Sequence, residues 1–369
     1  MAKGLILLAA GGTGGHLFPA EALANALAAR GLTVHLATDE RATKYGKAFP
    51  AEETHEIPSA TPSGGSPGRM LAAGARLAQG LMASWSLIGR LRPSAVVGFG
   101  GYPTVPPVLA AALRGTPAII HEQNGVLGRA NRLLAPRARL IATGFPEVRG
   151  VSGALKAKQR VTGNPVRQPV LDAAATPFEP LSPDGTLRLV VFGGSQGARI
   201  MSDIVPPALE RLSAADRGRL AVVQQARDED LTRVRDVYVR LGIAAEVSPF
   251  FGDMPARIAQ AHLVVARSGA STVAELAVIG RPSILVPLAQ SLDGDQAANA
   301  VTLAAIGAAT VIPQPDFTPE RLAGEIAARL RDPSGLTRAA EAAKSAGVPD
   351  AAERLADLVV EIAAAGRTR

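Results

Sequence analysis

The chain has 369 residues, more than one average domain contains, and this length favours two domains. Hydrophobic residues make up 47% and charged residues 19%, a composition typical of globular domains with apolar cores. The absence of cysteine excludes disulfides, thiolate catalysis and cysteine-based zinc sites. A net charge of +7 suits anionic partners, but one Trp and three Tyr offer little surface for base stacking, so no nucleic acid is expected.

The chain begins with an apolar run and a glycine-rich segment. Residues 5–10 (LILLAA) predict a buried parallel strand, and the run is shorter than the core of a usual signal peptide. No run approaches the ~20 apolar residues that span a bilayer, so a soluble or peripheral protein is expected. The loop 11–16 (GGTGGH), a helix over residues 19–30 and a strand over residues 33–38 complete a strand–helix–strand unit.

Similar units follow in the first half of the chain. Residues 95–99 predict a strand that enters a Gly-Gly-Tyr-Pro loop, and residues 108–114 predict a helix. Residues 118–121 predict a further strand that ends in Glu-Gln-Asn-Gly. The pattern breaks over the proline-rich residues 162–183, where we place the junction between two domains.

The second half repeats this pattern. Residues 187–192 and 263–266 predict strands followed by small-residue loops and helices, and residues 283–286 predict another strand. The tail, residues 349–365, predicts an amphipathic helix. Alternating strands and helices favour an α/β fold with parallel sheets flanked by helices. The expected divisions of the chain are residues 1–162, 163–345 and 346–369.

The first glycine loop of each half lies between a strand and a helix, where backbone N–H groups and the helix dipole favour an anion. Neither loop completes the dinucleotide pattern, since Leu17 stands at the third glycine position and Ser195 at a middle one. Asp39 ends the second strand, as a ribose-binding acid does in dehydrogenases, and keeps a nicotinamide-dependent enzyme open. No Walker-type loop occurs, which argues against a P-loop hydrolase.

A third loop, residues 267–275 (RSGASTVAE), places small residues and hydroxyls at a helix start, with Glu275 one turn in. Free N–H groups there suit a pyrophosphate, and the carboxylate suits two ribose hydroxyls. An ordinary capped helix with an acid near its start explains the same pattern.

Seven motifs, in order, resemble those of the MurG family of glycosyltransferases. They are residues 11–16 (GGTGGH), 98–102 (GFGGY), 121–125 (HEQNG), 163–167 (GNPVR), 193–198 (GGSQGA), 267–275 (RSGASTVAE) and 295–300 (DQAANA). Together they span most of the chain, and their number and order make the resemblance specific.

This resemblance implies a GT-B fold, in which two Rossmann-like domains have parallel sheets facing each other across a cleft. It implies UDP-N-acetylglucosamine as donor and lipid I, undecaprenyl-pyrophosphoryl-MurNAc-pentapeptide, as acceptor, with inverting transfer to the 4-hydroxyl of the muramyl sugar. It also implies an N-terminal domain for acceptor and membrane, a C-terminal donor domain, and a final helix packed back on the first domain. The expected location is peripheral, on the cytoplasmic face of the cell inner membrane, and no cofactor is expected.

Inverting transfer needs a base for the acceptor hydroxyl. His16, after the first glycine loop, is the first candidate, although orienting a phosphate or capping the following helix are alternatives for it. Glu122, at the carboxyl end of a predicted strand, is the second catalytic candidate. The residues expected on the acceptor side are Gly100, Gly101, Tyr102 and Asn131.

The resemblance also assigns contacts to the donor. Asn124 and Gln296 would contact the sugar, Arg167 the pyrophosphate, Glu275 the ribose, and Phe251 would mark the segment that reads uracil. The expected donor-binding residues are Thr13, Gly14, Gly15, Asn124, Arg167, Ser195, Phe251, Ala270, Ser271, Thr272, Glu275, Asp295 and Gln296.

Two features of the chain bear on metals. Asp293 and Asp295 resemble a metal-binding Asp-x-Asp, but GT-B enzymes usually manage without a metal, so none is expected in the reaction. The same loop departs from the family pattern, because Gln290 stands about where a His is common. Among the other histidines, His35 and His262 are interpreted as structural, and His55 has no role that the sequence indicates.

A lipid acceptor requires access to a membrane, and residues 69–82 mix apolar and basic side chains that suit an anionic leaflet. The expected membrane contacts are Arg69, Met70, Leu71, Arg76 and Leu81. The alternative is a core-facing helix, because apolar residues recur at helical spacing. These are Leu77, Leu81, Trp85 and Ile88.

Other functions stay open at this point. A GT-B transferase with another glycolipid acceptor would carry similar donor motifs, and a UDP-sugar epimerase has a similar two-domain fold. The nicotinamide enzyme would bind NAD(H) tightly, and a non-catalytic protein would bind UDP-N-acetylglucosamine without turnover.

Overall fold

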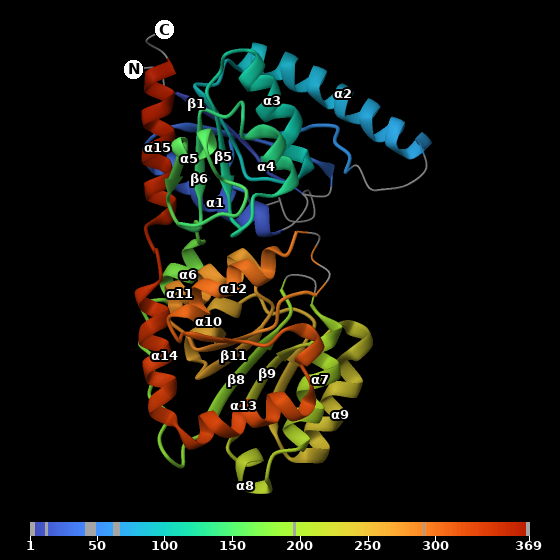
Figure 1. Cartoon of the computed structure of the whole chain (residues 1–369), viewed down its shortest axis with the longest axis vertical. Helices are drawn as coiled ribbons and strands as arrows, with labels where there is room; N and C mark the ends of the chain where they lie inside the picture. The colour runs from blue at the N-terminus through green and yellow to red at the C-terminus, as the bar shows by residue number, and fades with distance from the viewer. Residues whose placement is uncertain are drawn as a thin grey trace. The chain divides into compact units, whose positions relative to one another are not determined.

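The computed structural model describes residues 4–11, 14–40, 49–61, 67–194, 197–289, 291 and 293–366 (Figure 1). The chain divides into two compact units. Unit 1 comprises Met1–Arg167 together with Pro349–Arg369, and unit 2 comprises Gln168–Val348. No helix among the described residues is long and apolar enough to cross a membrane.

The described part of unit 1 is built on a seven-stranded parallel sheet with the order β3-β2-β1-β4-β5-β6-β7. Its strands are β1 (Leu5–Ala9), β2 (Thr33–Thr38), β3 (Glu53–Glu56), β4 (Ala95–Gly98), β5 (Ala118–Glu122), β6 (Leu140–Thr143) and β7 (Gln159–Val161). Its helices are α1 (Gly14–Ala29), α2 (Pro67–Leu91), η2 (Tyr102–Thr104), α3 (Val105–Leu113), α4 (Arg129–Leu134), α5 (Ala154–Ala157) and α15 (Ala351–Gly366).

Helices cover both faces of this sheet, which explains why β1 and β4 are apolar runs without alternation. On one face, Leu23 of α1 and Val359 of α15 share a buried core with Ile6 and Val97. On the other face α3 lies so close that a side chain at Gly98 would meet Val108 at 2.6 Å. The final helix therefore completes the core of unit 1, although the chain between it and Arg167 forms unit 2.

The described part of unit 2 contains a six-stranded parallel sheet with the order β10-β9-β8-β11-β12-β13. Its strands are β8 (Leu187–Phe192), β9 (Leu220–Gln225), β10 (Ala244–Ser248), β11 (Leu263–Ala266), β12 (Ser283–Leu285) and β13 (Ala309–Val311). Its helices are α6 (Gln168–Ala173), α7 (Arg199–Glu210), α8 (Ala214–Arg217), η3 (Asp228–Asp230), α9 (Leu231–Leu241), α10 (Met254–Gln260), α11 (Ala270–Ile279), α12 (Asp295–Ala305), η4 (Gln314–Asp316), α13 (Pro319–Arg331) and α14 (Pro333–Ser345).

The two sheets share one topology. In each, the strand order reverses beside the first strand of the unit, between β1 and β4 and between β8 and β11. In open α/β sheets, ligands bind outside the carboxyl ends of the strands at such a reversal. The loops after β1, β4, β8 and β11 are therefore where a site is expected in each unit.

Two helices begin earlier in the structure than the sequence predicted, and both contain proline near their start. The first helix was predicted from residue 19, but α1 begins at Gly14 and contains Pro19. The helix predicted from residue 108 begins at Val105, with Pro106 and Pro107 in its first turn. The first N–H groups of a helix have no partner inside it, so proline is tolerated in the first turn of α3. Pro19 is the sixth residue of α1 and instead removes one hydrogen bond from within that helix.

Candidate active site

In unit 1, His16 and the loop after β4 lie together. His16 belongs to the first turn of α1 and is half-buried. A side chain built on Gly100 would lie 3.5 Å from Nε2 of His16, and one on Gly101 would lie 3.5 Å from its Nδ1. Both glycines have positive φ, 85° and 75°, which only glycine adopts readily. The imidazole therefore packs directly against the Gly100–Gly101 backbone.

The side chain of Asn131, in α4, packs against the same loop. A Cβ built on Gly100 would lie 3.4 Å from Nδ2 of Asn131. Asn131 is buried, and its Oδ1 has no hydrogen-bond partner among the described residues. Tyr102, in η2, is half-buried. The expected acceptor-side residues and His16 are thus neighbours at the carboxyl edge of the unit 1 sheet.

The carboxylate of Glu122 organises the loop that follows β5. Its Oε1 accepts hydrogen bonds from the backbone N–H of Asn124 at 3.0 Å and from Nδ2 of Asn124 at 3.2 Å. Its Oε2 accepts from the backbone N–H of Gly128 and from Nδ2 of Asn131, both at 2.9 Å. One buried carboxylate thereby holds Asn124, a predicted donor contact, and Asn131, a predicted acceptor contact.

Two effects oppose each other at Glu122, which is only 2% exposed. Burial raises the pKa of its carboxyl group, while the hydrogen bonds from Gly128, Asn124 and Asn131 oppose that rise. Because both oxygens are engaged as acceptors, the geometry suits a group that positions the loop. The catalytic role predicted for Glu122 stays a prediction.

His121 is fully buried beside Glu122 and links β5 to the segment after β7. Its Nε2 lies 3.1 Å from the carbonyl oxygen of Gly163, and Nε2 of Gln123 lies 3.0 Å from its Nδ1. This arrangement requires a neutral ring that donates from Nε2 and accepts at Nδ1. Burial lowers the pKa of His121 to about 4. Asn164 adds a hydrogen bond to the carbonyl oxygen of Gln123 at 2.9 Å.

Arg167 is held at α1 by contacts that the sequence did not indicate. Its guanidinium carbon lies 3.7 Å from the ring centroid of Phe18. Burial raises the pKa of Glu21, while the positive charge of Arg167 opposes that rise. Nε of Arg167 has no hydrogen-bond partner among the described residues. The residue predicted to bind pyrophosphate therefore has a fixed ring contact and an open donor.

In unit 2, α11 begins directly after β11, next to the reversal of strand order. Its N-cap is Gly269, with extended backbone angles and no side-chain cap. Ser271 and Thr272 are half-buried in the first turn, and Oγ of Ser271 has no partner among the described residues. Glu275 is half-buried one turn further on. An uncapped helix start with open donors is suited to binding an anion.

The start of α12 is tied to this loop. Oγ of Ser268 donates to the carbonyl oxygen of Gln296 at 2.8 Å, and Nδ2 of Asn299 donates to the carbonyl oxygen of Ser268 at 3.1 Å. The backbone N–H of Leu288 donates to Oε1 of Gln296 at 3.0 Å, and the N–H of Gln296 donates to Oδ1 of Asp295 at 2.9 Å. The predicted sugar contacts Asp295 and Gln296 thus lie beside the predicted phosphate site.

The remaining predicted residues fall into three groups. Gly14 is buried and Gly15 exposed at the start of α1, and Ala270 is buried at the start of α11. The ring of Phe251 is 7% exposed and lies under the guanidinium of Arg257, at 4.4 Å from its centroid. Thr13, Ser195 and Gln290 lie outside the described residues.

The network around Glu122 was only partly foreseen. Sequence reasoning named Asn124 and Asn131 but missed Gln123, Asn164 and the Phe18–Arg167 contact. It assigned no role to Ser268 or Asn299. Gln123, Asn164 and Ser268 follow strands at the carboxyl edges of the sheets, which was the available signal for them, whereas Asn299 and Phe18 lie within helices.

Only the C-terminal part of α2 belongs to the core, where Ser84, Leu87 and Ile88 are buried. The predicted core face is therefore wrong for Trp85, which is 44% exposed, and Leu77 and Leu81 are half-buried. Met70 and Leu71 are 59% and 77% exposed. Arg69 is exposed, and Arg76 is exposed and lies 3.4 Å from Glu40.

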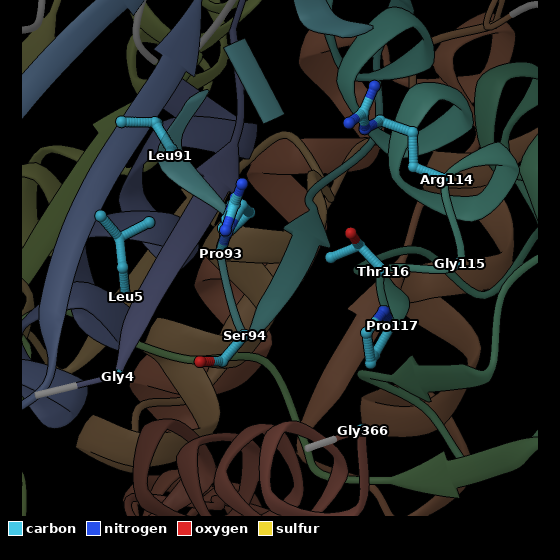
Figure 2. A pocket seen from close by; sticks show the side chains of 11 residues that line it. Gly4, Leu5, Leu91, Pro93, Ser94, Arg114, Gly115, Thr116, Pro117 and Gly366 are labelled. Atoms are coloured by element: carbon cyan, nitrogen blue, oxygen red, sulfur yellow. The ribbon is translucent and has the colours of Figure 1, made fainter. Parts of the chain in front are cut away.

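A hollow of about 440 Å³ in unit 1 lies at the opposite edge of the sheet, beside the amino ends of β1 and β4 (Figure 2). Leu91, Arg114 and Gly366 line it at the C-terminal ends of α2, α3 and α15. Helix C-termini carry partial negative charge and oppose an anion. Arg92 and Arg114 also line the hollow and offset that charge, and the hollow lies apart from the predicted site residues at the carboxyl edge.

Comparisons with known proteins agree with this geometry. Residues 6–143 match the glycosyltransferase family 28 N-terminal domain, and residues 188–355 match the glycosyltransferase family 28 C-terminal domain. A protein of Methylobacterium sp. (strain 4-46) is 61% identical over 370 residues, covering 100% of both chains. It is named UDP-N-acetylglucosamine–N-acetylmuramyl-(pentapeptide) pyrophosphoryl-undecaprenol N-acetylglucosamine transferase. A protein of the same name from Rhodopseudomonas palustris is 58% identical, covering 97% of this chain and 98% of its own.

Solved structures give the same result. The crystal structure of Acinetobacter baumannii MurG is similar with a TM-score of 0.77 and 29% identity, covering 97% of this chain and 99% of its own. UDP-GlcNAc 2-epimerase from Neisseria meningitidis, at 12% identity and a TM-score of 0.67, covers 97% of this chain and 99% of its own. That second likeness shows the shared fold alone. With both family 28 domains present and full-length relatives at about three-fifths identity, the chain belongs to the MurG family of GT-B glycosyltransferases.

Proposed function

We propose that this chain moves N-acetylglucosamine from UDP-N-acetylglucosamine to the 4-hydroxyl of the muramyl sugar of lipid I. The products are lipid II and UDP, and the anomeric centre is inverted. The observation that carries the proposal is 61% identity, over the full length, to a transferase named for this donor and acceptor. The product would serve peptidoglycan synthesis, and through it cell shape and division.

His16 is the proposed base. It is half-buried at the carboxyl edge of the unit 1 sheet, against the Gly100–Gly101 backbone. His121, by contrast, is fully buried and engaged at both ring nitrogens. In the proposed reaction His16 takes the proton of the acceptor hydroxyl while the oxygen of that hydroxyl bonds to the anomeric carbon of the donor sugar. The bond from that carbon to UDP breaks, and UDP leaves with the electron pair.

The uncapped start of α11 is the proposed pyrophosphate site. Its backbone N–H groups and the hydroxyls of Ser271 and Thr272 stabilise the negative charge that develops on departing UDP. Glu275, one turn on, is assigned to the ribose hydroxyls, and Asp295 and Gln296 to the sugar. Arg167 is assigned to phosphate oxygens, which its guanidinium binds in pairs.

A transfer assay tests the function. Purified protein is incubated with labelled UDP-N-acetylglucosamine and a lipid I analogue in EDTA, and the label is followed into lipid. We expect transfer, and a fall in kcat of roughly 10²- to 10⁴-fold in His16→Ala with UDP binding unchanged. Glu275→Ala is the contrasting variant, because it should raise the KM for the donor. Conversion of the donor to another sugar nucleotide, with no transfer to lipid, would show an epimerase instead.

We also propose that the protein acts peripherally on the cytoplasmic face of the inner membrane, through the exposed residues of α2. Met70, Leu71 and Met82 present apolar surface beside Arg69 and Arg76. Cosedimentation with anionic phospholipid vesicles tests this location. Leu71→Glu should weaken binding, whereas Val239→Glu should not, since Val239 is an equally exposed apolar residue (80%) on α9 of unit 2. Equal binding by both variants would exclude Leu71 as a membrane contact.

A further inference from the structure

Three potential metal ligands lie together on the outer strands of the unit 1 sheet. In the register of β2 and β3, His35 pairs with Glu53 and Ala37 pairs with His55. Paired residues of parallel strands point to the same face, and so do residues two apart along a strand. His35, Glu53 and His55 therefore share one face of the sheet. Val34 and Leu36 belong to the core on the other face, under α1 and α15.

The distances among these side chains suit a small metal ion. Nδ1 of His35 lies 3.0 Å from Nε2 of His55 and 3.8 Å from Oε2 of Glu53. One ligand atom from each residue lies within 4.8 Å of the others, and no other such group of three occurs among the described residues. Zinc bonds of about 2.1 Å in tetrahedral geometry place ligand atoms about 3.4 Å apart. Small shifts of the exposed Glu53 side chain would satisfy this geometry.

The burial of the two histidines also suits a metal site. Both rings are buried, at 6% and 9% exposure, and imidazole binds metals in its neutral form. Arg90 of α2 acts on His55 with a positive charge that opposes a bound cation. Glu53 supplies the compensating negative charge.

We propose that His35, Glu53 and His55 bind one divalent transition-metal ion of the zinc type. Two imidazoles and a carboxylate are ligands that zinc accepts, and a fourth position is left for water. The ion fastens β3, the outermost strand, to β2. The site lies apart from the Gly100–Gly101 loop, because β1 separates β2 and β3 from β4. A simple hydrogen bond between the two histidines is the competing explanation of their contact.

Zinc titration of the full-length protein tests the proposal. Chelator-treated, dialysed protein is titrated with zinc chloride in a calorimeter, and its thermal unfolding is followed with and without zinc. We expect one equivalent bound and a higher Tm with zinc, because the ion binds the folded state. Glu53→Gln should weaken the affinity at least tenfold, and His55→Gln should abolish binding.

Glu56→Gln is the matched control. Glu56 is an exposed carboxylate on the same strand, but it points to the opposite face and should leave zinc affinity unchanged. Because Glu53 is exposed, its variant should fold even if His55→Gln does not. No zinc uptake, or uptake that Glu53→Gln leaves unchanged, would overturn the proposal and leave the histidine hydrogen bond as the explanation. Sugar transfer in EDTA is a separate result that neither outcome affects.

Discussion

The carboxylate of Glu122 in unit 1 and the start of α11 in unit 2 differ in how completely their polar groups are bonded. In unit 1 both oxygens of Glu122 accept hydrogen bonds, from the loop that carries Asn124 and from Asn131 of α4. In unit 2 the start of α11 has no side-chain cap, and Oγ of Ser271 has no partner among the described residues. A buried carboxylate with all its hydrogen bonds formed holds a loop in one conformation. Donors without a partner at a helix start are available to bind an anion.

The difference indicates how each unit serves the proposed reaction. The loop of unit 1 is preorganised by the protein itself, so its geometry does not depend on a substrate. The loop of unit 2 is completed by the ligand, so its free donors are an energetic cost until a phosphate binds. Substitutions in the first loop should therefore affect folding, and substitutions in the second should affect binding.

The largest effect is expected for Glu122→Gln. The amide replaces one acceptor oxygen by a donor, so two loop N–H groups lose their partner and face another donor. Loss of two charge-assisted hydrogen bonds should reduce the free energy of unfolding by about 3–5 kcal/mol. Urea denaturation measures it. Glu147→Gln is the control, because the side chain of Glu147 is 92% exposed. An unchanged midpoint in Glu122→Gln would show that the network does not support the fold.

The second prediction is a loss of stability in acid that both units share. Burial lowers the pKa of His121 in unit 1 and of His262 in unit 2 to about 4, from 6.5 for an unperturbed histidine. The unfolded chain therefore binds protons first as the pH falls. Stability is full above about pH 6.5 and decreases toward pH 4, by up to about 3 kcal/mol for each histidine.

Unfolding free energies at pH 7.5 and pH 5 measure this loss. In His121→Gln and His262→Gln the difference between the two pH values should be smaller than in the unchanged chain. An equal difference in all three proteins would mean that other groups determine the acid sensitivity.

The third prediction separates binding from folding in unit 2. Gly269→Asp places a carboxylate at the N-cap of α11, where the backbone is extended and the nearest atom to a new Cβ is Oγ1 of Thr272 at 4.0 Å. The carboxylate should cap the helix and repel the pyrophosphate, so UDP affinity should fall about tenfold or more while Tm does not decrease. Calorimetric titration with UDP measures it. Gly269→Ala adds the Cβ without the charge and should bind UDP much more tightly than Gly269→Asp.

The smallest effect is expected for Ser271→Ala. The hydroxyl has no partner in the protein, so its removal should leave thermal stability unchanged or slightly higher. If the hydroxyl bonds a phosphate oxygen, UDP affinity should fall about three- to tenfold, the worth of one hydrogen bond of about 1 kcal/mol. A marked loss of stability with unchanged affinity would mean that Ser271 serves the fold and not the ligand.

Much of the fold was readable from the sequence, because parallel strands buried on both faces are continuous apolar runs. Residues 5–10 and 263–266 are of this kind, and residues 187–192 differ only by Arg188; the structure places β1, β11 and β8 there. The helix boundaries near Pro19 and Pro106 were wrong. Sequence alone does not distinguish a proline that starts a helix from one tolerated within its first turns.

Local sequence determined the α/β pattern, the glycine loops and the positions of candidate polar residues at strand ends, since these follow from backbone preferences and hydrophobic periodicity. The tertiary structure decided which of those side chains meet. Glu122 accepts a hydrogen bond from Asn131, and Arg167 stacks on Phe18. The rings of His35 and His55 lie within hydrogen-bond distance, and α15 packs into the core of unit 1. Each of these contacts joins residues that are separated along the chain. Only the strand order and the helix packing bring these residues into contact.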